Sequence, residues 1–168
     1  MKIKLFSSED YGCLMMYLRI PKWDLISSMI DPNDLNIEEG GLETEPHITI
    51  IYGLIDSEIN LDEVTEDASY LYHNYKIRLN NLSLFENDKY DVLKFDVDDH
   101  YGVFEKFHKF FKSNYPNVQT FKDYKLHCTV AYLNKGEGKK YLGEIKEVIC
   151  NSKYFVYSNP KMEKVIIK

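Results

Sequence analysis

The apolar and polar residues of this chain follow two periods, one typical of strands and one typical of helices. Residues 11–20 form a nearly continuous apolar run of strand length that stops at Pro21, which predicts a buried strand. Alternation of apolar and polar residues predicts four further strands at 75–85, 90–97, 154–157 and 163–167. Asn80 and Asn81 interrupt the first of these four, which indicates a bulge.

Apolar residues at helical spacing predict three helices, at 22–30, 61–72 and 101–114. Asn60 is placed to cap the second helix. The segments between the elements are polar and predict an acidic loop at 36–45, a turn at 86–89, a loop at 117–125 and a Gly- and Lys-containing loop at 134–140. Residues 142–149 fit a short helix or a short strand.

One short segment occurs twice. Residues 46–52 read Pro-His-Ile-Thr-Ile-Ile-Tyr and residues 126–132 read Leu-His-Cys-Thr-Val-Ala-Tyr, so both contain His-x-Thr followed by an aliphatic residue and, two positions later, a Tyr. Random order of five His and five Thr in 168 residues would give roughly 0.15 occurrences of His-x-Thr. One copy alone would be an ordinary half-exposed strand, but two copies half a chain apart indicate a shared role.

Each copy has the pattern of a strand with two different faces. Because side chains alternate along a strand, His47, Thr49 and Ile51 are predicted to share one face, opposite Ile48, Ile50 and Tyr52. The second copy predicts the same division, with His127, Thr129 and Ala131 opposite Cys128, Val130 and Tyr132. One face of each strand would then pack in a core while the other offers an imidazole beside a hydroxyl.

The order of elements predicts an α+β fold made of two related halves. Each half would contain strands, helices and one His-x-Thr strand, and no flexible linker divides the chain. We therefore expect a single domain over residues 1–168, which is within the usual size of one domain.

Composition narrows the class of protein. The chain is 44% hydrophobic, which is typical of a globular domain. A formal charge of −6 argues against a protein that holds long duplex nucleic acid, although a small anionic ligand in a local pocket is compatible with it. Cys13, Cys128 and Cys150 have neither disulfide nor zinc spacing. Residues 1–8 and the rest of the chain lack an apolar run of about 20 residues, so we expect no membrane segment and a cytoplasmic protein.

Two imidazoles facing each other suit general acid–base catalysis near neutral pH. Cleavage of a phosphodiester needs a base for the nucleophilic hydroxyl and an acid for the leaving oxygen. A Thr hydroxyl on the same strand face donates to a non-bridging phosphate oxygen, where negative charge develops. His47, Thr49, His127 and Thr129 are therefore the candidate catalytic residues, and this chemistry requires neither a metal nor a cofactor.

The doubled motif, His47 to Ile50 and His127 to Val130, resembles the two-histidine (2H) phosphoesterase superfamily. This resemblance implies two pseudo-symmetric lobes of antiparallel sheet with helices outside, and one His-x-Thr from each lobe facing a central groove. The segments 41–47, 52–54 and 138–142 look most like small phage-encoded members, some of which degrade the cyclic oligonucleotide signals of bacterial anti-phage (CBASS) immunity. For such a protein the compartment would be the host cytoplasm.

Several substrates fit this chemistry. The resemblance favours a metal-independent phosphodiesterase acting on cyclic oligonucleotides, with a 2′–5′ linked or terminal cyclic phosphate RNA end as the first alternative. A sponge that binds nucleotides without cleaving them is the second. We expect a monomer whose partner is a small nucleotide or oligonucleotide. Tyr11 at the start of the first strand and Lys139 in the 134–140 loop are candidate substrate-binding residues.

The remaining polar residues have ordinary interpretations. His73, His100 and His108 lie on predicted helices or at their ends and are expected to be surface histidines. Asp96, Asp98 and Asp99 are expected to form a solvated strand end, not a metal site.

Overall fold

The structure is a computed structural model that describes residues 10–118 and 123–168. The predictions for residues 1–8 and for the middle of the 117–125 loop lie outside the described residues. Seven strands are present within the described ranges: β1 (Tyr11–Arg19), β2 (His47–Ile55), β3 (Lys76–Glu86), β4 (Tyr90–Asp98), β5 (His127–Asn134), β6 (Val148–Ser158) and β7 (Lys164–Ile167). The same ranges contain the α-helices α1 (Trp23–Ser28), α2 (Leu61–Leu71) and α3 (Val103–Asn114) and the 3₁₀ helices η2 (Pro32–Asp34) and η3 (Glu137–Tyr141).

Most predicted elements are confirmed to within two residues at each end. Asn60 caps α2 by accepting a hydrogen bond from the backbone N–H of Asp62, and β3 is irregular between Leu79 and Leu82, where the two asparagines were predicted to form a bulge. The C-terminal region differs more. The 134–140 loop contains η3, and β6 begins at Val148, which makes the first strand of the last hairpin longer than predicted.

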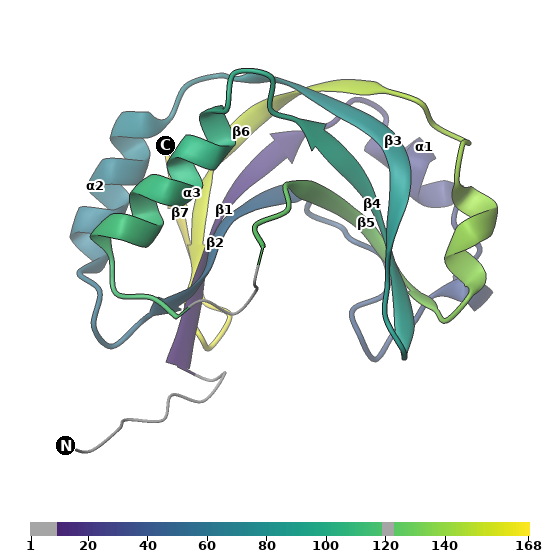
Figure 1. Cartoon of the computed structure of the whole chain (residues 1–168), viewed down its shortest axis with the longest axis horizontal. Helices are drawn as coiled ribbons and strands as arrows, with labels where there is room; N and C mark the ends of the chain where they lie inside the picture. Colours follow the sequence, from purple (N-terminus) through teal and green to yellow (C-terminus); the bar gives the residue numbers. More distant parts are fainter. Residues whose placement is uncertain (1–9, 119–122) are drawn as a thin grey trace.

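The strands form one antiparallel sheet in the order β1-β2-β5-β4-β3-β6-β7, and β6 also pairs with β1. β6 can pair with both β3 and β1 because it uses different residues for each: residues 148–151 pair with β3 and residues 151–158 pair with β1. The second connection between the two parts of the sheet is between β2 and β5, where only Ile48 and Cys128 are paired. The sheet therefore bends into an arch with two lobes (Figure 1). We call β1, β2, β7 and the C-terminal part of β6 the first lobe, and β3, β4 and β5 the second lobe.

The lobes are not the two halves of the chain. α3 belongs to the second half of the sequence but packs on β2 in the first lobe, beside α2 (Figure 1). In the opposite direction, the segment after α1 reaches the second lobe, where Leu35 and Leu42 form isolated bridges with Leu133 and Ala131 of β5. Each lobe is thus assembled from both halves, and a single large core joins them. The predicted α+β class with two lobes is confirmed.

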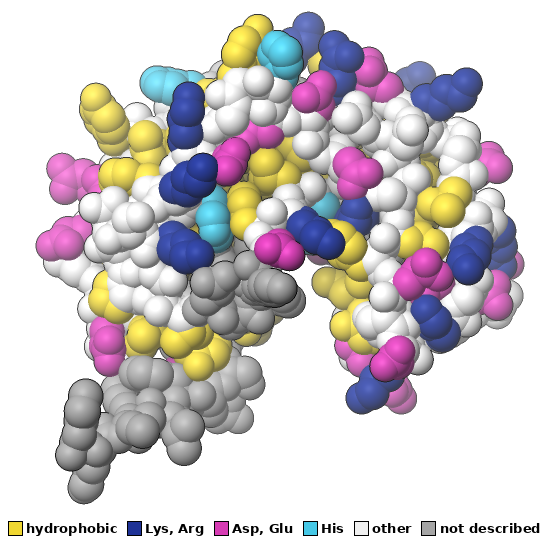
Figure 2. Space-filling model, in the orientation of Figure 1, with side chains coloured by type: hydrophobic (Ala, Val, Ile, Leu, Met, Phe, Trp, Pro, Cys, Tyr) yellow, Lys and Arg dark blue, Asp and Glu magenta, His cyan; other side chains and the backbone are white. Residues whose placement is uncertain are grey.

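The helices lie on the outside of the arch, so the opposite face of the sheet lines its inside (Figure 1). Ile48, Ile50, Cys128 and Val130 point to the outer side and belong to the main core, where each is 0% exposed. The neighbouring His47, Thr49, His127 and Thr129 therefore face the inside of the arch. Figure 2 shows the surface hollowed between the two lobes.

Candidate active site

The one pair that joins β2 to β5 brings the two His-x-Thr motifs together. Ile48 and Cys128 are paired antiparallel, which places their Cα atoms about 4.5–5.5 Å apart. Because the strands are antiparallel, His47 and Thr129 flank this pair at one end, and Thr49 and His127 flank it at the other end. All four side chains are thus gathered at the only place where these two strands meet, as the sequence predicted.

Both motif strands contain a β-bulge at the same position. On β2, Thr49 pairs with Met15 and Ile51 with Leu14, so Ile50 is the extra residue. On β5, Thr129 pairs with Lys94 and Ala131 with Leu93, so Val130 is the extra residue. Bulges redirect the side chains that follow them and are frequent beside active sites.

The bulges reverse the predicted faces beyond each Thr. Ile51 and Ala131 are buried, at 2% and 0% exposure, whereas Tyr52 is 38% exposed. The prediction that Ile51 and Ala131 share the histidine face, with Tyr52 and Tyr132 in the core, is therefore wrong. The bulge instead turns both tyrosines toward the inside of the arch, where they extend the site as His-x-Thr-x-x-Tyr.

The two imidazoles are held in the same way. Nδ1 of His47 lies 2.8 Å from the carbonyl oxygen of Glu45, and Nδ1 of His127 lies 2.7 Å from that of Lys125. Because a carbonyl oxygen only accepts, Nδ1 carries the hydrogen in both rings. Each Nε2 is then left for the substrate, either as a base or, when protonated, as an acid.

The surroundings of His47 are acidic and aromatic. The Glu43 carboxylate lies 3.8 Å from Nδ1 of His47, and the ring stacks against Tyr17 with centroids 5.6 Å apart. Glu43 is anchored in the other lobe, because its backbone N–H donates to the carbonyl oxygen of Val130. It therefore links the β5 bulge to His47 across the arch.

The surroundings of His127 are drier and contain a cation. Its ring packs against Phe85 in a T-shaped arrangement, with centroids 4.9 Å apart. Burial lowers the pKa of His127 below its ordinary value, and the charge of Lys94 acts in the same direction. Asp96 and the hydrogen bond to Lys125 act against these effects. The net direction favours a neutral imidazole.

The two threonines have different neighbours. Thr129 is only 8% exposed and lies in hydrogen-bond contact with the phenol of Tyr132. Thr49 is in contact with the thiol of Cys13, whose pKa burial raises to about 12. A thiol in that state is a poor nucleophile at neutral pH, so Cys13 supports the site without reacting.

His108 and Tyr124 hydrogen-bond to the backbone of β2. The sequence did not predict this contact. Their rings stack with centroids 3.8 Å apart and an interplanar angle of 5°. Nδ1–H of His108 donates to the carbonyl oxygen of Ile50, and the Tyr124 hydroxyl donates to that of Thr49, both at 2.8 Å. The prediction that His108 is an ordinary surface histidine is wrong, whereas His73 and His100 are exposed as expected.

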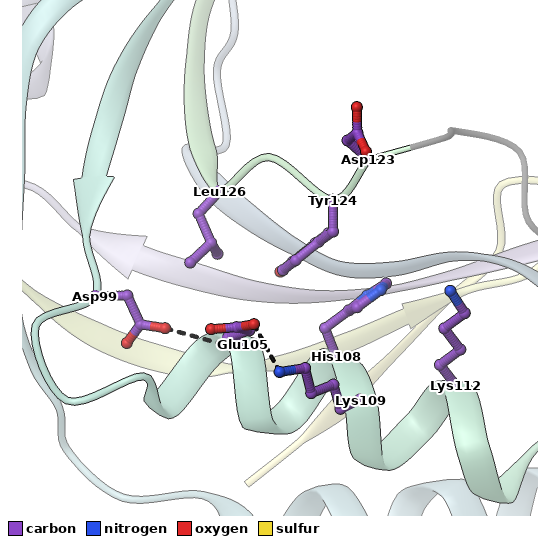
Figure 3. A pocket seen from close by; sticks show the side chains of 8 residues that line it. All are labelled: Asp99, Glu105, His108, Lys109, Lys112, Asp123, Tyr124 and Leu126. Atoms are coloured by element: carbon purple, nitrogen blue, oxygen red, sulfur yellow. Dashed lines mark hydrogen bonds and ion pairs between the residues drawn. The ribbon is translucent and has the colours of Figure 1, made fainter.

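His108 and Tyr124 also line a cavity of about 570 Å³ beside α3 (Figure 3). This cavity lies behind the β2 bulge and does not include His47 or His127 among its lining residues. We therefore place the candidate site on the inner face of the arch, where the chemistry-bearing groups converge, and not in this cavity.

The two predicted substrate-binding residues lie in different places. Tyr11 packs edge-on against Tyr52, with centroids 6.4 Å apart, and thus borders the inner face near β2. Lys139 lies on η3, beyond the end of β5 opposite to His127, and its ammonium is 3.4 Å from the Glu86 carboxylate. No contact among the described residues links Lys139 to the histidines.

The acidic residues at the end of β4 serve the fold. Asp99 accepts hydrogen bonds from the backbone N–H groups of Val103 and Glu105 at the start of α3, and Asp98 lies 3.8 Å from Arg78. Among residues 10–118 and 123–168, no cluster of three His, Cys, Asp or Glu is arranged to hold a metal ion. The same residues contain no helix long and apolar enough to cross a membrane.

Comparison with known proteins finds relatives of the fold only among solved structures. No family model matches the chain, and no curated protein matches it. Usb1 from Kluyveromyces marxianus has a similar structure, with 9% sequence identity and a TM-score of 0.61 over 95% of this chain and 98% of that chain. The structure of the same protein with uridine monophosphate has 10% identity and a TM-score of 0.62 over 96% and 99%. At such low identity the likeness shows a shared fold.

Proposed function

We propose that this chain is a phosphodiesterase that cleaves small oligonucleotides with its two histidines and without a metal ion. The observation that carries the proposal is the matched hydrogen bonding of the two rings. In each ring, Nδ1–H donates a hydrogen bond to the carbonyl oxygen two residues upstream. This contact fixes the tautomer and the orientation of the ring, so both Nε2 atoms are available for proton transfer at one place between the lobes.

The reaction transfers a phosphoryl group between two oxygens. One imidazole takes the proton of a nucleophilic hydroxyl or water, whose oxygen forms a bond to phosphorus. The bond from phosphorus to the leaving oxygen breaks, and that oxygen takes the proton of the other imidazole. The histidines exchange their protonation states in the process, and proton exchange with solvent restores them.

Thr49 and Thr129 complete the site by contacting the phosphate. As charge develops on the non-bridging oxygens, hydroxyl donors fixed on rigid strands stabilise it without reorganising. The tyrosines that the bulges turn inward, Tyr52 and Tyr132, border the same surface, and Tyr11 lies next to Tyr52. Aromatic faces beside a phosphate site suit nucleobases of any sequence.

Cyclic oligonucleotide immune signals are the substrate that we propose first, with a phage as the source of the chain. Support comes from the resemblance of its motif surroundings to small phage 2H proteins. The charge of −6 is compatible with a small substrate held locally and disfavours long duplexes.

A second candidate substrate is an RNA end, either 2′–5′ linked or carrying a terminal cyclic phosphate. One observation favours it: a protein of similar fold, Usb1 from Kluyveromyces marxianus, has been solved with uridine monophosphate. A sponge that only binds nucleotides is a weaker candidate, because binding alone does not require two preset proton-transfer groups.

A substrate panel tests the proposal. The protein is incubated in EDTA with cyclic di- and trinucleotides, with 2′–5′ and 3′–5′ linear oligonucleotides and with RNA ending in a cyclic phosphate, and products are separated by chromatography. We expect cleavage of at least one class, and the preferred class separates the two substrate candidates. Tight binding without turnover of any class would identify a sponge and contradict the proposal.

A further inference from the structure

The two motifs differ in the residues that face them from the neighbouring strand. On β1, Tyr17 and Met15 are paired with His47 and Thr49. On β4, Asp96 and Lys94 are paired with His127 and Thr129. Residues paired across antiparallel strands point to the same face of the sheet, so an ion pair lies directly beside one motif, where a tyrosine and a methionine lie beside the other.

Lys94 is unusual because its charge is buried. The residue is 4% exposed, and its ammonium donates to Ser83 Oγ at 2.7 Å and to Asp96 Oδ1 at 2.5 Å. The ammonium also lies 4.2 Å from the centre of the Phe85 ring. Lysine is rarely buried to this extent without a specific reason, and this one is fixed on three sides.

Phe85 connects the ammonium to the catalytic imidazole. Lys94 lies over the face of the Phe85 ring, while His127 packs against the same ring at 4.9 Å with an interplanar angle of 82°. The charged and titratable groups that act on His127 are Lys94 and Asp96 from β4 and His47 from β2. From the segment just before β5, the exposed Lys125 lies farther out, with its ammonium 5.9 Å from the Phe85 ring.

We propose that Lys94 is a positioning residue that holds His127 as the neutral base, so that His127 takes the proton of the nucleophile and His47 gives the proton to the leaving oxygen. This inference rests on the proposed function, because it assigns the two proton-transfer roles within the same site.

Lys94 and its partner Asp96 differ in their exposure to solvent. The side chain of Lys94 is 6% exposed, whereas that of Asp96 is 52% exposed. Water therefore screens the carboxylate more strongly than the ammonium. Burial and the Lys94 charge together lower the pKa of His127, while the Asp96 charge only partly opposes them.

His47 has the Glu43 carboxylate 3.8 Å from its Nδ1. A lysine lies near this ring as well, because the Lys164 ammonium is 5.6 Å from the centre of the Tyr17 ring that stacks on His47. That ammonium is paired with the Glu45 carboxylate, so two carboxylates and one ammonium lie around His47.

The first experiment follows the pH dependence of kcat/KM for Lys94→Met and Lys94→Gln, which remove the charge, and for Lys94→Arg, which keeps it. A neutral base makes the acidic limb of the profile report His127. Loss of the positive charge should move that limb to higher pH, so the loss of kcat/KM relative to the unmodified chain should be about threefold or more larger at pH 5.5 than at pH 8. Lys94→Arg and the exposed control Lys89→Met should keep the limb in place.

The second readout does not depend on activity. NMR titration of the histidine ring signals, assigned with His127→Gln, should show the His127 midpoint moving upward in Lys94→Met and Lys94→Gln. A role limited to packing would lower stability in these variants without moving the midpoint.

The direction of proton transfer is tested with a p-nitrophenyl phosphodiester of a nucleotide, whose leaving group needs no proton. His47→Ala should recover most of its lost rate on this substrate, whereas His127→Ala should not. Rescue of His127→Ala instead would reverse the assigned roles, and an unmoved His127 midpoint in both charge-removing variants would overturn the role of Lys94. If the unmodified chain cleaves no phosphodiester, the proposed function fails, but the NMR titration still decides the role of Lys94.

Discussion

The stacked pair His108 and Tyr124 leads to a prediction about β2, the strand that contains the first His-x-Thr motif. On its second edge β2 pairs with β5 at Ile48 and with Asn117 at Leu54. Between these two points, the carbonyl oxygens of Thr49 and Ile50 accept hydrogen bonds from side chains instead of a neighbouring strand. Tyr124 and His108 supply them. His108→Phe keeps an aromatic ring for the stack but removes the hydrogen bond to Ile50.

The expected cost follows from that single contact. Loss of a hydrogen bond that leaves its partner unpaired costs about 1–3 kcal/mol. For a chain of this length that corresponds to a decrease of about 2–10 °C in Tm. His108→Ala should cost about 0.5–1.5 kcal/mol more, because the stack on Tyr124 is lost as well. The exposed His100→Phe serves as the control and should change Tm by less than about 1 °C.

The same variant should impair catalysis. If the β2 bulge shifts when Ile50 loses its donor, Thr49 and His47 move with it, and a misplacement of about 1 Å can cost roughly 10²-fold in rate. We therefore expect kcat/KM to fall by about 10- to 100-fold in His108→Phe at a temperature where the variant is fully folded. A variant with unchanged Tm and unchanged kcat/KM would refute the supporting role of this pair.

Further predictions concern the metal, the threonines, pH and packing. Activity should persist in excess EDTA, because in the proposed mechanism the histidines perform both proton transfers, and full loss restored by Mn²⁺ or Zn²⁺ would contradict this. Thr49→Ala and Thr129→Ala should each reduce kcat/KM by less than either His→Ala change, since only one phosphate hydrogen bond is lost. Burial lowers the pKa of His108 in the folded protein. The unfolded chain therefore takes up a proton at its ordinary pKa of about 6.5, before the folded protein does, and the free energy of unfolding falls as the pH drops below that value. His108→Phe removes this effect, so urea titrations should show a smaller loss of stability at acid pH in the variant. Gly12→Ala should reduce stability by about 1–3 kcal/mol, because a Cβ there would lie 2.1 Å from the Tyr157 hydroxyl; an unchanged Tm would show that Tyr157 moves freely.

The sequence predicted that the four motif side chains lie at one place, but not which residues border them. His47, Thr49, His127 and Thr129 follow from alternation over three residues, which needs no knowledge of the fold. Tyr52 and Tyr132 were misplaced because the extra bulge residue stands in an apolar run, where Ile50-Ile51 and Val130-Ala131 hide the change of phase. A one-residue insertion in the pattern becomes visible only when the partner strand is known.

Contacts between distant segments were also beyond the sequence. His108 is on a helix whose polar positions look solvated, and its partner Tyr124 lies after a loop, so nothing local reveals the stack. The packing of α3 on β2 in the first lobe is likewise a tertiary contact. The order of elements along the chain does not determine it. Lys94 stands in an alternating strand, but its burial depends on Ser83, Phe85 and Asp96 surrounding it.

In the proposed mechanism, two histidines, one from each motif, divide the two proton transfers of a single reaction. The most direct test is single-turnover cleavage of the best substrate by the unmodified chain, His47→Ala, His127→Ala and the double variant, with binding of the same substrate measured for each. We expect each single change to lower the cleavage rate by about 10²–10⁴-fold while binding largely survives, and the double variant to be far less impaired than the product of the two losses. Cleavage by His127→Ala at the rate of the unmodified chain would contradict the paired-histidine mechanism.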